Sequence, residues 1–308
     1  RVKALLCNPD DIRKAIQHYY QSEPTESDTV ETQAEQISAG ARVECMATLM
    51  RQIDVLPTLP QTVQQVQEAA ASPDSSAKEV AKIVSRDPAI SGKLLKLANS
   101  AAYGFTHKVD NVELATSLLG LRETIMAVTS SAVVTLTENS KNFDHEAFWR
   151  RSTMCAAAAK KIGEACGLKK VPGLFTAGLL CEMGRFALCE SAPERYSKIP
   201  SGLSDAELLA AEEKIFGIGH TEAGHVLAEH WGLPPELAEP IRYHLDPDRA
   251  ESCPEIAAVV ALAARCVDAC VRGESADPGL FTGMEPALQR LGASVDDLLT
   301  VYASLEDC

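Results

Sequence analysis

The chain has 308 residues, of which 46% are hydrophobic and 23% are charged. Such a composition is typical of a globular protein and excludes a wholly disordered chain, a fibrous repeat and a disulfide-stapled miniature. The 43 acidic residues outnumber the 29 basic ones, and the resulting net charge of −14 disfavours direct binding to nucleic acid or to an anionic membrane.

The ten cysteines are scattered and form no C-x-x-C pair, so neither a zinc ribbon nor a thioredoxin-type motif is expected. The sequence has no signal-peptide pattern and no run of about 18 apolar residues, the length that a membrane span requires. We therefore expect a cytoplasmic protein with reduced cysteines and no membrane partner. The chain begins at Arg1 instead of Met, which indicates that an upstream part is missing.

Residues 1–48 are expected to be the tail of that upstream module together with a connecting helix. Apolar residues first recur at helical spacing over residues 10–20, and the polar stretch 21–29 follows as a linker. A long, largely polar helix is predicted over residues 30–50. We expect it to carry a signal from the upstream module into the rest of the chain.

The pattern changes near residue 49, where Pro57 and Pro60 force an extended segment. Five short helices are predicted after it, over residues 61–71, 76–84, 89–99, 111–119 and 121–136. Ser76 is the expected N-cap of the second helix, and Asp87 that of the third.

Asn99 ends the third helix, and we expect its amide to bind backbone groups of the turn at residues 101–103. The alternative is that Asn99 and Tyr103 form a partner-binding edge.

From residue 144 onward the sequence indicates stacked antiparallel helices, and no segment alternates apolar and polar residues as a half-buried strand would. The fold class is therefore predicted to be all-α. The helices are expected over residues 144–167, 172–190, 204–216, 220–231, 235–244 and 254–272, with two more at the C-terminus. Trp231 is predicted to be a buried anchor between its own helix and the next, through Leu237 and Ile241.

Histidines are the first candidates for chemistry, because four of them lie between residues 220 and 244. His220, His225 and His230 are five residues apart, so they do not share one face of a helix as metal ligands should. We expect His220 and His244 to be partly buried and hydrogen-bonded instead. The sequence also lacks a G-x-S-x-G nucleophile motif and the glycine-rich loops that bind phosphate.

Several short motifs then follow one another in a family-specific order. They are Leu56-Pro-Thr-Leu-Pro60, Arg86-Asp-Pro88, Ala98-Asn-Ser-Ala-Ala102, Tyr103-Gly104, Trp149 to Ser152, Ala177-Gly-Leu-Leu180, Glu213 with Gly217 and His220, Trp231-Gly-Leu-Pro234, Ile241 and His244. Over residues 49–248 the chain resembles the HDOD domain of bacterial signalling proteins. The resemblance implies an N-terminal helical bundle fused to a degenerate subdomain similar to HD-type metal-dependent phosphohydrolases, with residues 249–308 as helices that pack on the HD-like half.

The family-motif residues are expected to have structural roles. They are Pro57, Pro60, Asp87, Pro88, Asn99, Ser100, Tyr103, Gly104, Gly120, Trp149, Gly178, Trp231 and Pro234.

The chain differs from catalytic HD enzymes at the positions of the metal ligands, and these differences argue against catalysis. The resemblance places a histidine, a His-Asp doublet and a later aspartate around the metal that activates water. The corresponding positions here hold Arg151, Cys181-Glu182 and Ala264-Arg265. A guanidinium repels the required cation. The paired-histidine position of the related cyclic-dinucleotide phosphodiesterases is His244-Leu245, and no GYP motif follows it.

A second, shorter resemblance lies upstream, where about twenty residues are similar to the end of the N-terminal domain of secretion and pilus-assembly ATPases. A receiver domain is an equally good candidate for the missing module.

These observations predict a non-catalytic signal-transduction module without a cofactor that acts by binding a partner protein, and they are compatible with a homo-oligomer. The alternative is a divergent HD phosphohydrolase that holds a metal through Glu182, His220 and His244 and acts on a nucleotide or another phosphoester. A third hypothesis is a nucleotide-binding sensor without catalysis, which requires a pocket that a sequence does not reveal.

Overall fold

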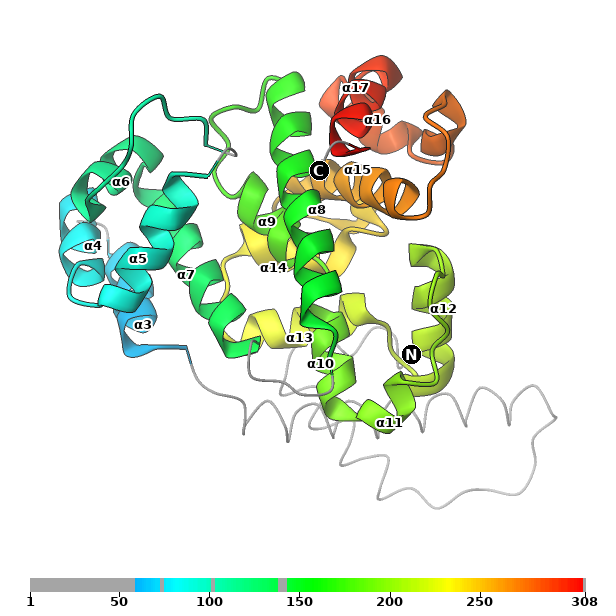
Figure 1. Cartoon of the computed structure of the whole chain (residues 1–308), viewed down its shortest axis with the longest axis horizontal. Coiled ribbons are helices and arrows are strands. Elements are labelled where there is room, and N and C mark those ends of the chain that lie inside the picture. Colours follow the sequence, from blue (N-terminus) through cyan, green and yellow to red (C-terminus); the bar gives the residue numbers. More distant parts are fainter. Residues whose placement is uncertain (1–58, 73–74, 101–102, 138–142, 307–308) are drawn as a thin grey trace. The chain divides into compact units, whose positions relative to one another are not determined.

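The structure is a computed structural model that describes residues 59–72, 75–100, 103–137 and 143–306. Helices are the only regular elements in these ranges, which confirms the predicted all-helical class (Figure 1). The chain divides into a larger unit, Pro57–Cys181 with Leu233–Cys308, and a smaller unit whose described residues are 182–232. The helix predicted over residues 30–50 and the linker before it lie outside the described residues, as does Pro57.

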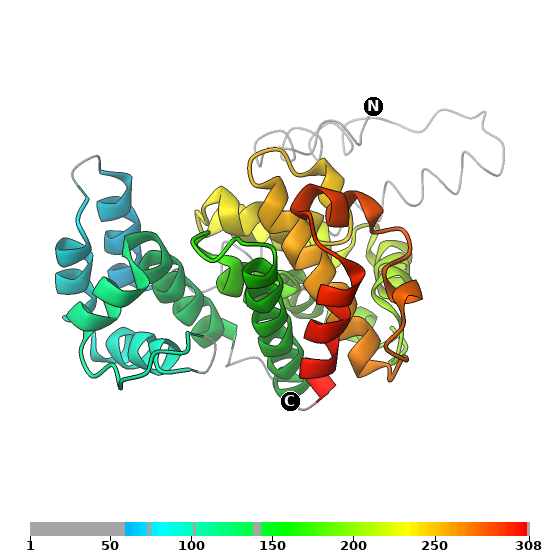
Figure 2. The same cartoon turned by 90° about the horizontal axis from the view of Figure 1, so that it is seen from above.

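Five helices open the larger unit, in agreement with the prediction from turn and cap residues. They are α3 (Gln61–Ala71), α4 (Ala77–Val84), α5 (Pro88–Ala98), α6 (Val112–Leu119) and α7 (Leu121–Thr137). In both views α3 to α6 cluster beside α7 (Figure 1, Figure 2). A positive φ of 81° at Gly120 lets the chain turn between α6 and α7, a backbone conformation that favours glycine.

The cap of α5 is the one that the sequence predicts. Asp87 Oδ1 accepts hydrogen bonds from the backbone N–H groups of Ala89 and Ile90, at 3.0 and 3.1 Å. Its second oxygen accepts the Thr62 hydroxyl at 2.9 Å. The carboxylate therefore starts α5 and also ties that helix to α3.

The Asn99 amide binds backbone groups, as predicted. The groups that the structure describes belong to Leu95 and Val109, while Ala101 and Ala102 of the predicted turn lie outside the described residues. The Asn99 side chain receives the Val109 N–H at 2.8 Å and donates to the Val109 carbonyl at 2.7 Å. It also donates to the Leu95 carbonyl at 2.8 Å. An amide matches a peptide group in both directions, so Asn99 fastens a loop that returns ten residues later.

The rest of the larger unit is built on two long helices, α8 (His145–Ala165) and α15 (Pro254–Val271), which pack against each other. Around them lie α9 (Leu174–Leu180), α14 (Pro235–Tyr243), α16 (Glu285–Leu291) and α17 (Val295–Glu306), with short 3-10 turns η2 (Pro247–Arg249) and η3 (Pro278–Phe281). Small residues bring α8 and α9 together. A Cβ on Gly178 would lie only 2.8 Å from the Cys155 carbonyl oxygen.

The single helix predicted over residues 172–190 was wrong, because the chain breaks at the Cys181-Glu182 doublet. Helix α9 ends at Leu180, and α10 (Met183–Ser191) begins three residues later in the smaller unit. The break places the doublet between two helices, where side-chain contacts are not fixed by helical spacing.

The smaller unit contains α10, α11 (Pro193–Tyr196), α12 (Asp205–Phe216) and α13 (His220–His230). Helix α10 packs on α13. At the crossing, a Cβ on Gly184 would collide with the His220 carbonyl oxygen and would lie 2.5 Å from Gly224 N. The two backbones therefore touch without an intervening side chain.

Trp231 follows α13 as its C-cap residue and is only 4% exposed. The predicted burial of Trp231 is confirmed, and the side chain is not exposed as a recognition residue would be.

No single helix within the described ranges combines the length and the apolar character that a membrane crossing needs. One pair, α6 with residues 121–136 of α7, meets those criteria together, and the two helices meet at a bend of 119°.

Candidate functional site

The residues that the resemblance places at the metal positions of catalytic HD enzymes lie on α8, just after α9 and on α15. Helix α8 carries Arg151, whose guanidinium Nη1 is 3.9 Å from Oδ1 of Asp268 on α15. The side chain of Arg151 is 12% exposed and that of Asp268 is 6% exposed. A carboxylate so deeply buried needs a positive partner, and α8 supplies one.

Two further arginines, both near the C-terminal end of α15, complete the surroundings of Asp268. Arg265 donates to the Leu280 carbonyl at 2.8 Å, approaches Asp268 Oδ2 at 3.4 Å and binds Glu274 at 2.9 Å. Arg272 donates to Asp268 Oδ2 at 2.8 Å and also pairs with Glu274. The result is a network of three guanidinium groups and two carboxylates, in which Asp268 is the most buried member. We call these five side chains the arginine network.

Thiols lie beside this network. The Sγ atoms of Cys155 and Cys181 are 3.7 Å apart, and the Cys181 thiol donates to the Gly178 carbonyl at 3.3 Å. Burial, with smaller contributions that include the nearby Cys155, raises the pKa of Cys266 to about 12. Because a thiolate and not a thiol binds metal or attacks a substrate, Cys266 is inert at neutral pH.

The three residues of the alternative metal-site hypothesis each have another partner. Glu182 accepts a hydrogen bond from Arg185 at 2.8 Å. His244 Nδ1 lies 3.1 Å from the Ile241 carbonyl oxygen, which can only accept, so this nitrogen donates. Among the described residues, no three His, Cys, Asp or Glu side chains are grouped so as to hold a metal ion.

His220 is bound by a buried carboxylate. Its Nδ1 is 2.5 Å from Glu212 Oε2, and the same oxygen accepts the His220 backbone N–H at 2.8 Å. Both side chains are almost fully buried. The burial and hydrogen bonding predicted for His220 and His244 are therefore confirmed.

Sequence reasoning did not identify Glu212 as the partner of His220. The motif string contains Glu213, which is exposed, whereas its neighbour Glu212 is buried and binds the histidine. The signal was present, because Glu212 lies four residues after Leu208 and four before Phe216, both buried on the same face of α12.

Asp268 was missed entirely. It lies four residues after Ala264, the position that the resemblance assigns to the late metal-binding aspartate, and therefore one turn along the same face of α15.

The sequence profile of the HDOD domain matches residues 56–247, which is more than half of the chain. This protein belongs to the HDOD domain family.

Solved structures share the HDOD fold. An HDOD domain protein of unknown function from Geobacter sulfurreducens is 24% identical, with a TM-score of 0.68, and the match covers 87% of this chain and 95% of that one. A candidate metal-dependent phosphohydrolase from Shewanella amazonensis is 25% identical, with a TM-score of 0.59 and coverage of 90% and 99%. A candidate signal transduction protein from Marinobacter aquaeolei is 19% identical, with a TM-score of 0.60 and coverage of 87% and 66%.

A curated relative from Treponema pallidum (strain Nichols), an uncharacterized protein, is 25% identical over 203 residues, 64% of this chain. The match spans 39% of that relative's length, so the HDOD chain corresponds to about two fifths of it.

The donor set of this HDOD chain does not fit the divalent metal that the name of the Shewanella protein implies. Two of the relevant positions hold arginines that already bind carboxylates, and a third holds the thiol of Cys181, which donates to a backbone carbonyl. Divalent metals in hydrolases need neutral imidazole or free carboxylate ligands with one open position. The arginine network supplies neither.

Proposed function

We propose that this HDOD protein is a non-catalytic output module of bacterial signal transduction that acts in the cytoplasm by binding a partner protein. In this proposal, α3 to α7 form an N-terminal bundle and the remaining helices form a degenerate HD-like half. The observation that carries the proposal is the arginine network, because two of its members, Arg151 and Arg265, stand at positions that the resemblance assigns to metal ligands and are paired with carboxylates.

The chemistry of phosphoester hydrolysis explains why this observation matters. The reaction needs a cation that lowers the pKa of bound water and neutralises charge on the phosphoryl oxygens. Here Asp268 and Glu274 already accept from arginines, so their lone pairs are engaged. Bringing in a dication would require displacing guanidinium groups from largely buried partners, which is costly in a low-dielectric interior.

Two further observations support a signalling role. The profile match is to the HDOD domain, which the resemblance associates with bacterial signalling proteins. The Marinobacter aquaeolei neighbour is a candidate signal transduction protein with the same fold. The net charge of −14 favours a protein partner over nucleic acid.

The proposal is tested by metal analysis and by a hydrolysis assay on the 308-residue chain purified without chelator. We expect far less than one equivalent of metal and no hydrolysis of cyclic dinucleotides or of a generic phosphodiester above a protein-free blank. Stoichiometric metal together with turnover would overturn the proposal.

A phosphohydrolase is the second candidate, because two solved structures of this fold are candidate phosphohydrolases and Glu182 is a buried carboxylate, 3% exposed. The variant Glu182→Ala separates the two functions, with the exposed Glu194→Ala as the matched control. If the chain is an enzyme, Glu182→Ala abolishes both metal binding and turnover while Glu194→Ala retains them. If it is an output module, signalling in a reporter strain persists in both variants.

A further inference from the structure

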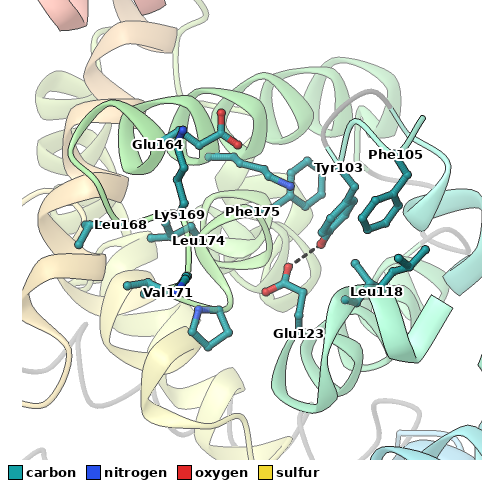
Figure 3. A pocket seen from close by; sticks show the side chains of 14 residues that line it. Tyr103, Phe105, Leu118, Glu123, Glu164, Leu168, Lys169, Val171, Leu174 and Phe175 are labelled. Atoms are coloured by element: carbon teal, nitrogen blue, oxygen red, sulfur yellow. Dashed lines mark hydrogen bonds between the residues drawn. The ribbon is translucent and has the colours of Figure 1, made fainter. Parts of the chain in front are cut away.

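A cavity of about 430 Å³ lies in the larger unit, away from the arginine network. Its walls come from the segment after α5, from α6 and α7, from the end of α8 and from residues 168–175 (Figure 3). The volume is within the range of small-molecule binding sites, about 300–1,000 Å³. Arg151, Cys181 and Arg265 do not line it.

One wall of the cavity is aromatic. The ring of Tyr103 stacks near Phe105 with centroids 6.1 Å apart and an interplanar angle of 21°, and it lies 5.9 Å from the ring of Phe175. Figure 3 shows Tyr103 and Phe105 side by side at the cavity. Flat apolar surfaces of this kind bind planar rings by stacking.

A lysine ammonium lies above this wall without a hydrogen bond. Lys160 Nζ is 3.7 Å from the centroid of the Tyr103 ring. Within the described part of the chain, no acceptor lies within hydrogen-bonding distance of this nitrogen and no carboxylate lies within 4.0 Å. Burial lowers the pKa of Lys160, although the nearby carboxylates of Glu123 and Glu164 oppose this effect. A half-buried ammonium gains most from a negatively charged acceptor.

The remaining charges of the cavity also favour an anion. Lys169 and Lys170 are exposed at its edge. Of the two carboxylates, that of Glu123 is occupied, because Oε1 accepts the Tyr103 hydroxyl at 2.5 Å and Oε2 accepts the Gly173 N–H at 2.6 Å. The cavity is lined by three ammonium groups and two carboxylates, an excess of one positive charge in a chain whose net charge is −14.

We propose that this cavity binds a small anion that carries a planar aromatic ring, with a mononucleotide as the ligand class. The ring stacks on the wall formed by Tyr103 and Phe105, and the phosphate supplies the acceptors that Lys160 lacks. This inference is independent of the proposed function, because a ligand sensor can belong to an output module or to an enzyme. Its test measures binding alone, so the metal and hydrolysis assays can fail without affecting it.

The test is isothermal titration of the 308-residue chain with AMP, GMP, ATP and GTP, and with inorganic phosphate to separate the two parts of the ligand. We expect saturable binding of at least one nucleotide and much weaker binding of phosphate. Lys160→Gln should weaken the nucleotide about tenfold or more, the scale expected when a charge-assisted contact is lost. The matched control is Lys161→Gln, whose ammonium binds Ser304 and does not line the cavity.

Two further variants keep the test decisive. Phe105→Leu should weaken nucleotide binding and leave phosphate binding unchanged. If Lys160→Gln does not fold, as judged by circular dichroism, the exposed pair Lys169→Gln with Lys170→Gln takes its place and should reduce both the affinity and its dependence on salt. The proposal is overturned if no nucleotide binds at about 1 mM, if phosphate alone binds equally tightly, or if the lysine variants bind like the unmodified chain.

Discussion

The phenol of Tyr103 donates to Glu123 Oε1 at 2.5 Å, which joins the segment after α5 to α7. Burial and then the charge of Glu123 raise the pKa of Tyr103 well above its usual value, so the phenol stays protonated and remains a donor. The second oxygen of Glu123 receives the Gly173 N–H just before α9. One carboxylate thus holds two loops that are 70 residues apart in the sequence.

Removing this hydroxyl tests its contribution to stability. Tyr103→Phe should lower the free energy of unfolding by about 1.5–3 kcal/mol, the range for a hydrogen bond to a charged group. The measurement is urea unfolding followed by circular dichroism. Tyr243→Phe is the matched control, because the Tyr243 hydroxyl has no hydrogen bond to any described residue. Equal losses in the two variants would contradict the assignment.

Two helical glycines, Gly184 at the contact between α10 and α13 and Gly92 in α5, should respond in opposite ways to replacement by alanine. Gly184→Ala should destabilise the protein by about 3 kcal/mol or more, because the new methyl group collides with backbone atoms that cannot move independently. Gly92→Ala, within α5, meets no atom within 4 Å and should stabilise it by about 0.5–1 kcal/mol through helix propensity. Thermal unfolding of both variants gives the comparison, and a neutral Gly184→Ala would disprove the close approach.

Glu239 predicts a specific dependence on pH. Burial raises its pKa, but hydrogen bonds from the backbone N–H groups of Ser252, Cys253 and Glu251 outweigh this and hold the pKa below the ordinary 4.5. A lowered pKa in the folded state stabilises the protein above about pH 4.5, and the stabilisation is lost as the pH falls through the lowered value.

The variant Glu239→Gln isolates this effect. The difference in unfolding free energy between the unmodified chain and Glu239→Gln should be constant from about pH 7 to pH 5 and should shrink below that. Urea titrations across the range measure it. Glu251→Gln provides the control, since only its backbone N–H, and not its carboxylate, takes part in the contact. A difference that does not change with pH would rule out the carboxylate as the cause.

Trp231 should contribute strongly to stability. Truncation to alanine is expected to cost about 3–5 kcal/mol, as for other buried aromatic side chains. Its emission, isolated by replacing Trp149 with phenylalanine, should be blue-shifted and inaccessible to iodide because the side chain is buried. Red, quenchable emission together with normal stability in Trp231→Ala would place it on a partner surface instead.

Local chemistry explains which parts of the fold could be predicted. A helix cap acts within three residues, so Ser76 and Asp87 were identified from the sequence alone and both cap their helices in the structure. The five helices before residue 138 followed from the same turn signals. The break at Cys181-Glu182 was not predicted, because neither residue is a helix breaker and tertiary packing decides where α9 stops.

The candidate sites depend on pairings that no local pattern encodes. Asn99 reaches Val109, Arg151 reaches Asp268, and Lys160 lies over Tyr103. Each pair joins segments at least ten residues apart in the sequence, which only the folded chain brings together. Identifying the altered metal positions required the family resemblance. The structure was needed to identify the carboxylates that pair with the arginines at these positions.

The arginine network also restricts how this sequence can evolve. Exchanging Arg151 or Arg265 for a metal ligand would leave Asp268 buried with fewer positive partners, and breaking such a pair costs about 3–5 kcal/mol, close to the whole stability of many domains. A descendant would regain a metal centre most readily by changing several of these positions together, since each single step destabilises the protein. Once these ion pairs have formed, a return to a metal site is therefore disfavoured. Proteins that carry the network should diversify in their surfaces and partners while these interior residues are retained.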